Sequence, residues 1–293
     1  MPVTTTHLID ASPYIFRAWF SVPKSIVDPK GRVVNAVYGF VSFLLKYLAD
    51  EQPTHIAITF DRHFNHSFRN EEYPAYKAQR EESPKELEAQ VDPCVEAAQA
   101  MGLATFIDER YEADDLIATI MHQTDSRSSH YVIVTSDKDL AQLVSERVTL
   151  SNPAKKERFD AAAVEAKFGV KPTQIVDYLA LAGDAVDNIP GVKGIGPKTA
   201  AQLLQRYGSL EKIYEAVPAM KQSSVRGEVS VAAKLELNVD NAGLSKRLAT
   251  VATNAPLQVT LDDLRYRGPD EARVDEVFSR LGFNTLRERA ARG

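Results

Sequence analysis

The sequence contains a single cysteine, Cys94, so it cannot form an internal disulfide and suits a reducing compartment. No apolar run approaches the roughly 20 residues that a membrane-spanning helix needs. The N-terminal residues lack the basic start and the long apolar run of a secretory signal. The 14 glycines and 15 prolines are too few for a fibrous or linker-dominated chain. We therefore expect a cytoplasmic protein with no membrane partner.

Two kinds of catalytic site are also missing from the sequence. With one cysteine and only six histidines, a zinc site is not expected, and no Gly-x-Ser-x-Gly motif marks a serine nucleophile. The excess of acidic over basic residues, 40 against 35, at first argues against a nucleic-acid partner. What the chain does have is a globular composition, 44% hydrophobic and 26% charged, and a length of 293 residues that suits two domains.

The first half of the chain alternates strand-like and helix-like segments. Residues 5–10, 54–61 and 131–137 are short apolar and β-branched runs, which is typical of strands buried on both faces. Residues 36–48 and 113–121 carry apolar side chains at helical spacing. This alternation predicts an α/β fold with a parallel sheet and helices on both of its faces.

The organisation changes along the chain. Residues 70–90 are highly charged and contain two prolines, which favours a functional excursion or a mobile segment. From about residue 170 the strand signal fades and helices dominate. We place a domain change near Lys171 and Pro172, which divides the chain into residues 1–170 and 171–293. The last forty residues include a helix around residues 274–281 and carry no informative chemistry.

Carboxylates are the most informative residues of the sequence. Each of the three expected strands ends in an aspartate, and the carboxyl ends of parallel strands meet at one edge of a sheet. Glu112 and Asp115 are expected to share a helix face, and Asp137 and Asp139 to point the same way in extended backbone. The candidate metal ligands are Asp10, Asp61, Glu112, Asp114, Asp115, Asp137, Asp139, Asp184 and Asp187.

These carboxylates together predict a divalent metal site. Any one of them alone is more simply a helix cap or a surface acid. Nine crowded carboxylates would repel one another and require a counter-charge, and Mg²⁺ or Mn²⁺ suits oxygen ligands without thiolates or imidazoles. Two such ions about 4 Å apart can activate water and stabilise the leaving oxygen of a phosphodiester. Without these nine acids the rest of the chain is net basic, so a nucleic-acid partner is compatible with its charge.

A glycine-rich stretch at residues 191–199 is the clearest local motif. It is not a Walker loop, because Pro197 stands where that motif has lysine and no strand precedes it. Pro197 and Gly208 instead predict a short helix over residues 198–207 whose free amides face the glycine turn. Such a hairpin can hold a DNA backbone phosphate, although a tight helix–helix turn without a ligand is the alternative. The candidate contacts are Gly191, Lys193, Gly194, Gly196, Lys198 and Thr199.

A second basic site is expected within the charged segment. Lys77 and Arg80 would share a helix face, and Tyr76 would offer a ring for base stacking. Four glutamates surround these residues in the sequence, so an ordinary solvated surface is an equally good interpretation.

Six motifs in this order resemble one family, the 5′-nuclease domain of bacterial DNA polymerase I and its free-standing flap endonuclease relatives. They are LID (8–10), FD (60–61), YKAQR (76–80), EADD (112–115), TSDKD (135–139) and GDAVDNIPGVKGIGPKTA (183–200). The resemblance implies a PIN-like parallel-sheet nuclease domain, a helical domain with a helix–three-turn–helix DNA-binding motif, and a helical arch at about residues 70–95. It also implies a structure-specific 5′ flap endonuclease and 5′-3′ exonuclease of replication and repair.

The resemblance also implies residue roles. The first metal region would contain five acids, Asp10, Asp61, Glu112, Asp114 and Asp115, of which Asp114 would be catalytic. The second would contain four, Asp137, Asp139, Asp184 and Asp187. Lys77 and Arg80 match the pair that contacts the scissile phosphate, Tyr76 the neighbouring aromatic residue, and Arg17 a basic residue after the first strand. The implied cofactors are two or more Mg²⁺ or Mn²⁺ ions, with K⁺ at the hairpin.

The implied partners are DNA with 5′ flaps, overhangs or nicks, a DNA polymerase and a ligase. The resemblance also implies a bacterial protein that is a monomer and acts at the nucleoid. The chain departs from the family at Ala11, where glycine is usual, and around Arg69, whose role is therefore open. The alternatives are a PIN-type ribonuclease and a non-catalytic protein that binds DNA structures. The chain resembles a free-standing enzyme or a fragment of a polymerase.

Overall fold

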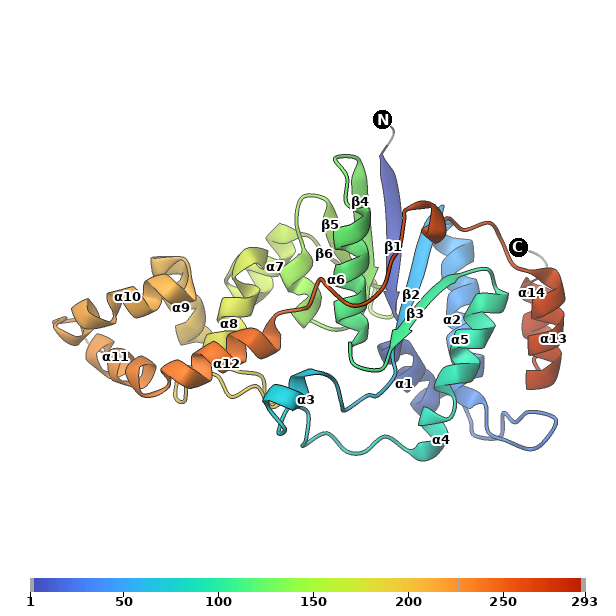
Figure 1. Cartoon of the computed structure of the whole chain (residues 1–293), viewed down its shortest axis with the longest axis horizontal. Helices are drawn as coiled ribbons and strands as arrows, with labels where there is room; N and C mark the ends of the chain where they lie inside the picture. The colour runs from blue at the N-terminus through green and yellow to red at the C-terminus, as the bar shows by residue number, and fades with distance from the viewer. Residues whose placement is uncertain (1–2, 226, 291–293) are drawn as a thin grey trace.

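The structure is a computed structural model that describes residues 3–225 and 227–290. In these residues the strands form one six-stranded sheet of order β3-β2-β1-β4-β5-β6 (Figure 1), parallel except for β6. The strands are β1 (Thr4–Asp10), β2 (His55–Asp61), β3 (Ala104–Asp108), β4 (Ser129–Val134), β5 (Val148–Asn152) and β6 (Glu157–Phe159). The three expected strands are confirmed, but β4 ends three residues before Asp137.

Helices cover both faces of the sheet, as expected for a parallel sheet. Alternate residues of β1 divide between the two cores: Ile9 packs on the side of α2 (Asn35–Glu51), and Leu8 packs on the side of α6 (Ala113–Thr124). Two further helices, α1 (Ser12–Ser21) and α5 (Val91–Ala100), contribute to the core on the α2 side. The α/β fold class expected from the sequence is confirmed.

The charged segment does not form the expected helical arch. It contains only α3 (Arg69–Glu72) and α4 (Lys85–Glu88), with turns between them. Lys77 has a left-handed backbone, with φ of 57°, and its N–H donates to the carbonyl of Asp187 at 3.0 Å. Lys77 and Arg80 therefore do not share a helix face, because tertiary contacts to the chain near Asp187 override local helix formation.

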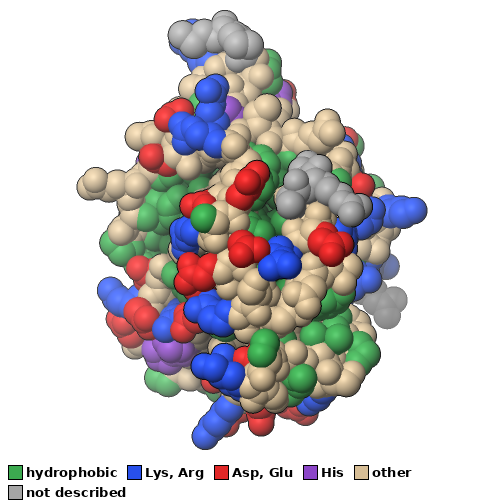
Figure 2. Space-filling model, turned by 90° about the vertical axis from the view of Figure 1, so that its right-hand side faces the viewer, with side chains coloured by type: hydrophobic (Ala, Val, Ile, Leu, Met, Phe, Trp, Pro, Cys, Tyr) green, Lys and Arg blue, Asp and Glu red, His purple; other side chains and the backbone are tan. Residues whose placement is uncertain are grey.

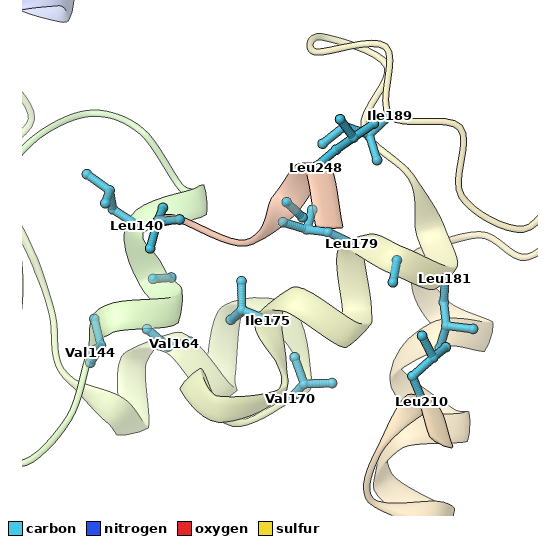
Figure 3. Close-up of a cluster of buried hydrophobic side chains, with 14 of the residues drawn as sticks. Leu140, Val144, Val164, Val170, Ile175, Leu179, Leu181, Ile189, Leu210 and Leu248 are labelled. Carbon is cyan, nitrogen blue, oxygen red and sulfur yellow. The ribbon is translucent and has the colours of Figure 1, made fainter. Parts of the chain in front are cut away.

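The second half is helical, as expected, and is joined to the sheet through a shared core. After α7 (Ala161–Phe168) come α8 (Ile175–Ala182), α9 (Pro197–Tyr207), α10 (Leu210–Lys221), α11 (Glu228–Leu237) and α12 (Val239–Ala249). Figure 3 shows Leu140 and Val164 beside Ile175, with Leu179 and Leu248 beyond them, all in one buried cluster. The two halves are thus in direct apolar contact.

After α12 the described chain, as far as residue 290, returns to the side of the sheet, so the part expected to be a separate helical domain also contacts the strands. The Tyr266 N–H donates to the Thr54 carbonyl beside β2 at 2.9 Å. The final helices, α13 (Glu271–Leu281) and α14 (Asn284–Ala290), pack against α5 and α2 respectively (Figure 1). Figure 2 shows this face, where basic and acidic side chains are interspersed. None of the described helices has the length and hydropathy needed to span a bilayer.

Candidate metal and nucleic-acid site

A cavity of about 380 Å³ opens at the carboxyl ends of the central strands. Asp10 ends β1 and Asp61 ends β2, and the loop after β4 brings Asp137 to the same place. The N-terminal residues of α6 complete the acidic wall. The acids that line the cavity are Asp10, Asp61, Glu112, Asp114 and Asp137. The expectation that strand ends converge holds for the three aspartates, although a short loop rather than the strand itself carries Asp137.

Neighbouring donors fix the orientation of the two strand-end carboxylates. Asp10 accepts hydrogen bonds from the Thr135 hydroxyl at 2.8 Å and from the Ser12 N–H at 3.2 Å. Asp61 accepts from the Ser12 hydroxyl and from the N–H of Ala113, the first residue of α6, at 2.7 Å. Sequence reasoning missed both roles: Ser12 belongs to none of the six motifs, and Thr135 begins the TSDKD motif but carries no charge and was not singled out.

The electrostatics of the cavity are those of an acid cluster without enough counter-charge. Burial raises the pKa of Asp10 and of Asp114 well above the ordinary aspartate value, and nearby carboxylates raise both further. Burial is also the main reason why the pKa of Asp61 and of Asp137 is raised. Ionised carboxylates here therefore oppose folding at neutral pH and favour a bound cation.

A second group of acids, Asp139, Asp184 and Asp187, lies next to the first, and two of its three carboxylates are paired with basic side chains. Burial and the neighbouring Asp137 and Asp184 raise the pKa of Asp139. Lys138 pairs with Asp184 at 2.7 Å, and Arg80 pairs with Asp187. Asp137 and Asp139 do not lie in extended backbone: Asp139 begins a 3₁₀ turn (Asp139–Leu143), and its N–H donates to Asp137 at 2.8 Å.

Asp115 differs from the other eight acids, because its carboxylate is already saturated. Arg69 donates two hydrogen bonds to it, both at 2.8 Å, and the N–H groups of Glu112 and Ala252 donate at 3.1 and 2.7 Å. Its side chain is fully buried and lies outside the acidic cavity. Helix α6 begins at Ala113 with Glu112 as its N-cap, so Glu112 and Asp115 form a capping box. The metal-ligand role expected for Asp115 is replaced by a structural one, and this pairing gives Arg69 its role.

The basic residues of the charged segment reach the acids, but Tyr76 does not offer a stacking surface. Tyr76 is 3% exposed and packs in the core. Lys77 is buried, with its ammonium 2.8 Å from Glu112 and 3.9 Å from Asp187. Burial alone would raise the pKa of Glu112. The positive charges of Lys77 and Arg69 outweigh this effect and lower that pKa to about 2. Lys77 and Arg80 both line the acidic cavity.

The glycine-rich hairpin has the expected geometry, with one exception. Helix α9 starts at Pro197, and no side chain caps its N-terminus. Lys193, Gly194, Gly196 and Lys198 are exposed, and Thr199 is half-buried. Gly191 is buried instead: its N–H donates to Ser245 at 2.9 Å, and a Cβ there would lie 2.4 Å from the Gly183 nitrogen. Gly191 thus permits close packing and is not available to a phosphate.

Two basic residues differ from the sequence expectations. Arg17 is exposed on α1 and lines a different cavity from the acids. Lys234, on α11, was not singled out, yet its ammonium donates to the Gly194 carbonyl at 3.1 Å. A lysine 40 residues from the hairpin gives no local sequence signal, so only the packing of α11 reveals it.

The donor set of this site fits divalent cations. All the candidate ligands are carboxylates, and one oxygen of Asp139 is buried without a hydrogen-bond partner, as is the Arg80 Nε. Across residues 3–225 and 227–290, no three His, Cys, Asp or Glu side chains are close enough to hold an ion as they stand.

We expect Mg²⁺ to raise the melting temperature of the protein at neutral pH relative to EDTA. Binding to the folded state alone stabilises it by about 2.7 kcal/mol at a hundredfold excess over the dissociation constant. In EDTA, stability should fall as the pH rises from the ordinary aspartate pKa through the raised pKa values of Asp10 and Asp114. The variant Asp10→Asn should melt higher than the parent in EDTA. Thermal melts that coincide in Mg²⁺ and EDTA would contradict the metal site.

Comparison with known families covers nearly the whole chain. The profile of the 5'-3' exonuclease N-terminal resolvase-like domain matches residues 5–169, and that of the 5'-3' exonuclease C-terminal SAM fold matches residues 170–272. DNA polymerase I of Bacillus subtilis (strain 168) is 37% identical over 286 residues, covering 96% of this chain and 32% of that protein. For DNA polymerase I of Mycobacterium tuberculosis (strain ATCC 25618 / H37Rv) the identity is 38% over 290 residues, covering 97% and 31%.

The chain spans about a third of the length of these curated relatives. Among solved structures, the 5'-exonuclease of bacteriophage T5 with bound divalent zinc ions has a TM-score of 0.68 at 20% identity, covering 98% of this chain and 97% of that one. The catalytic core of Rad2 in complex with DNA substrate has a TM-score of 0.61 at 15% identity, covering 99% and 92%. These two structures share the fold. The chain belongs to the 5'-3' exonuclease family, with both its resolvase-like domain and its SAM fold.

Proposed function

We propose that this protein is a structure-specific 5′ flap endonuclease and 5′-3′ exonuclease that hydrolyses DNA phosphodiester bonds with divalent cations. The observation that carries the proposal is the acidic cavity: carboxylates from β1, β2, α6 and the loop after β4 surround one space, with Lys77 and Arg80 in its wall. An under-compensated carboxylate cluster beside two cations suits a bound metal and a phosphate. Family membership supports the same reaction.

Two groups of carboxylates would hold the ions, which we propose to be two or more Mg²⁺ or Mn²⁺. Asp10, Asp61, Glu112 and Asp114 would serve the first group. We add Asp137 to it, although the family resemblance implies the second group, because Asp137 lines the same cavity. Asp139, Asp184 and Asp187 would serve the second. When bound, such ions supply an activated water and neutralise charge on the leaving oxygen. Ser12 and Thr135 keep the strand-end carboxylates oriented for this purpose.

Lys77 and Arg80 would receive the scissile phosphate. In the structure they pair with Glu112 and Asp187 and stay near the cavity. An incoming phosphate would compete for these cations, and its developing negative charge would be offset by them. Because Arg80 is part-exposed and Lys77 is buried, Arg80 is the better placed to move onto the substrate first.

The hairpin before α9 would hold the duplex away from the reacting strand. Its exposed amides, with Lys193, Lys198 and Thr199, suit a backbone phosphate and give no base readout. K⁺ is a proposed cofactor at this hairpin, where the Lys234 ammonium donates a hydrogen bond to the Gly194 carbonyl. We propose that the protein acts as a bacterial cytoplasmic monomer on 5′ flaps, overhangs and nicks, in replication and repair alongside a polymerase and a ligase.

The alternative activity is that of a PIN-type ribonuclease. Two substrates, one with a DNA flap and one with an RNA flap, distinguish the two activities. We expect a duplex with a DNA flap to be cut near its junction in Mg²⁺, and the same duplex with an RNA flap of equal sequence to be cut more slowly. The measurement is product length and rate from 5′-labelled strands under single-turnover conditions. Faster cleavage of the RNA flap, or of free RNA without duplex, would favour the ribonuclease.

A further inference from the structure

A second and larger cavity, of about 950 Å³, shares no lining residue with the acidic one, although α1 contributes residues to both. Its walls are α1, α2 and the hairpin between β5 and β6. The fold accounts for it: the core on the α2 side contains residues of β1, β2 and β4 but none of β5 among the described residues. On this face, the described helices therefore do not cover the part of the sheet formed by β5 and β6. The uncovered space has the size that is typical of small-molecule sites.

The floor of this cavity is aromatic. Tyr14 and Phe43 stack with their ring centroids 3.9 Å apart and their planes 7° from parallel, and Tyr38 and Tyr47 line the same space. The Tyr14 hydroxyl is buried and has no hydrogen-bond partner, although the Tyr47 hydroxyl bonds the His7 ring at 2.6 Å. These aromatic side chains give the cavity an apolar surface on which a flat ring can pack.

The rim of the cavity carries four basic side chains, two of which are paired, and three acidic ones: Arg17, Lys46, Lys156 and Arg158 with Asp50, Glu51 and Glu157. Lys46 pairs with Asp50 at 2.7 Å, and Arg158 pairs with Glu51 at 3.4 Å. Arg17 on α1 and Lys156 in the β5–β6 turn also line the cavity, and within the described part of the chain neither lies within ion-pair distance of a carboxylate. An aromatic floor below two free cations suits a flat ring that carries an anionic group.

We propose that this cavity is a binding site for a mononucleotide, with the base against Tyr14 and Phe43 and the phosphate facing Arg17 and Lys156. The size, the aromatic lining and the two free cations each match one part of such a ligand. The site is separate from the catalytic cavity, so the inference stands whether or not the proposed nuclease activity is correct.

The test is calorimetric titration of the whole protein with deoxyadenosine 5′-monophosphate in EDTA, where the acidic cavity repels a phosphate. We expect saturable binding of one nucleotide per chain. Deoxyadenosine, which lacks the phosphate, and deoxyribose 5-phosphate, which lacks the base, should each bind about tenfold more weakly or worse. No saturation at about 10 mM nucleotide, a free energy weaker than about −3 kcal/mol, would overturn the proposal, as would equal binding of deoxyribose 5-phosphate.

Two variants locate the site. Lys156→Glu should weaken nucleotide binding about fivefold, the upper range for one exposed charge, while Lys155→Glu, one residue away and outside this cavity, should leave it within twofold. Equal effects of the two lysine changes, or displacement of the nucleotide by a flap duplex, would contradict a separate site.

Discussion

Replacing Asp114 by Asn is expected to abolish DNA cleavage while duplex binding persists. Asp114 lines the acidic cavity from the first turn of α6, and burial followed by Asp137 and Asp10 raises its pKa. Asparagine keeps the size of the side chain but cannot carry the negative charge that holds a cation. A loss of about a thousandfold in single-turnover rate corresponds to about 4 kcal/mol of transition-state stabilisation.

The matched control is Asp125→Asn at the other end of the same helix. Asp125 is exposed and pairs only with Arg147 at the surface, so the cleavage rate should stay within about twofold of the parent. Duplex binding by both variants is measured on a native gel in EDTA. Loss of binding with intact cleavage in Asp114→Asn would refute the assignment of the cavity.

Replacing Arg69 by Ala is expected to lower the free energy of unfolding by about 3–5 kcal/mol, the usual cost of leaving a buried charge unpaired. Arg69 is 4% exposed. Besides its two hydrogen bonds to Asp115, it donates to the carbonyls of Leu248 and Thr250 at 2.8 and 3.0 Å. One guanidinium therefore connects α3, the start of α6 and the end of α12.

Arg247→Ala is the matched control for Arg69→Ala. Arg247 is exposed and pairs with the exposed Glu72, so its loss should change stability by no more than about 0.5 kcal/mol. Urea denaturation of both variants gives the comparison. Equal midpoints for Arg69→Ala and Arg247→Ala would show that the buried pair does not join these elements.

The sequence was sufficient for features that depend on local pattern. Apolar runs that end in aspartate predicted strands β1 and β2 and the convergence of their carboxylates, because strand direction alone sets that geometry. Pro197 and Gly208 likewise predicted α9, which ends at the expected residue and begins one residue earlier than expected, at Pro197. Family membership and the mixed fold also followed from the order of the motifs.

Other features depend on contacts between distant residues, which local pattern does not contain. Asp114 and Asp115 are adjacent acids in the sequence, and only Arg69, 46 residues from Asp115, separates their roles. Tyr76 stands among charged residues but is buried against the core. The return of the chain to the sheet after α12 depends on pairings such as Tyr266 with Thr54.

The most direct test of the account is cleavage of a 5′-labelled flap duplex by the protein in Mg²⁺ and in EDTA in parallel, with binding followed on a native gel. We predict a discrete product near the junction in Mg²⁺, no product in EDTA, and a shifted band in both. An intact flap in Mg²⁺ together with a shifted band would contradict the account, because it would leave a DNA-binding protein whose acidic cavity has no catalytic role.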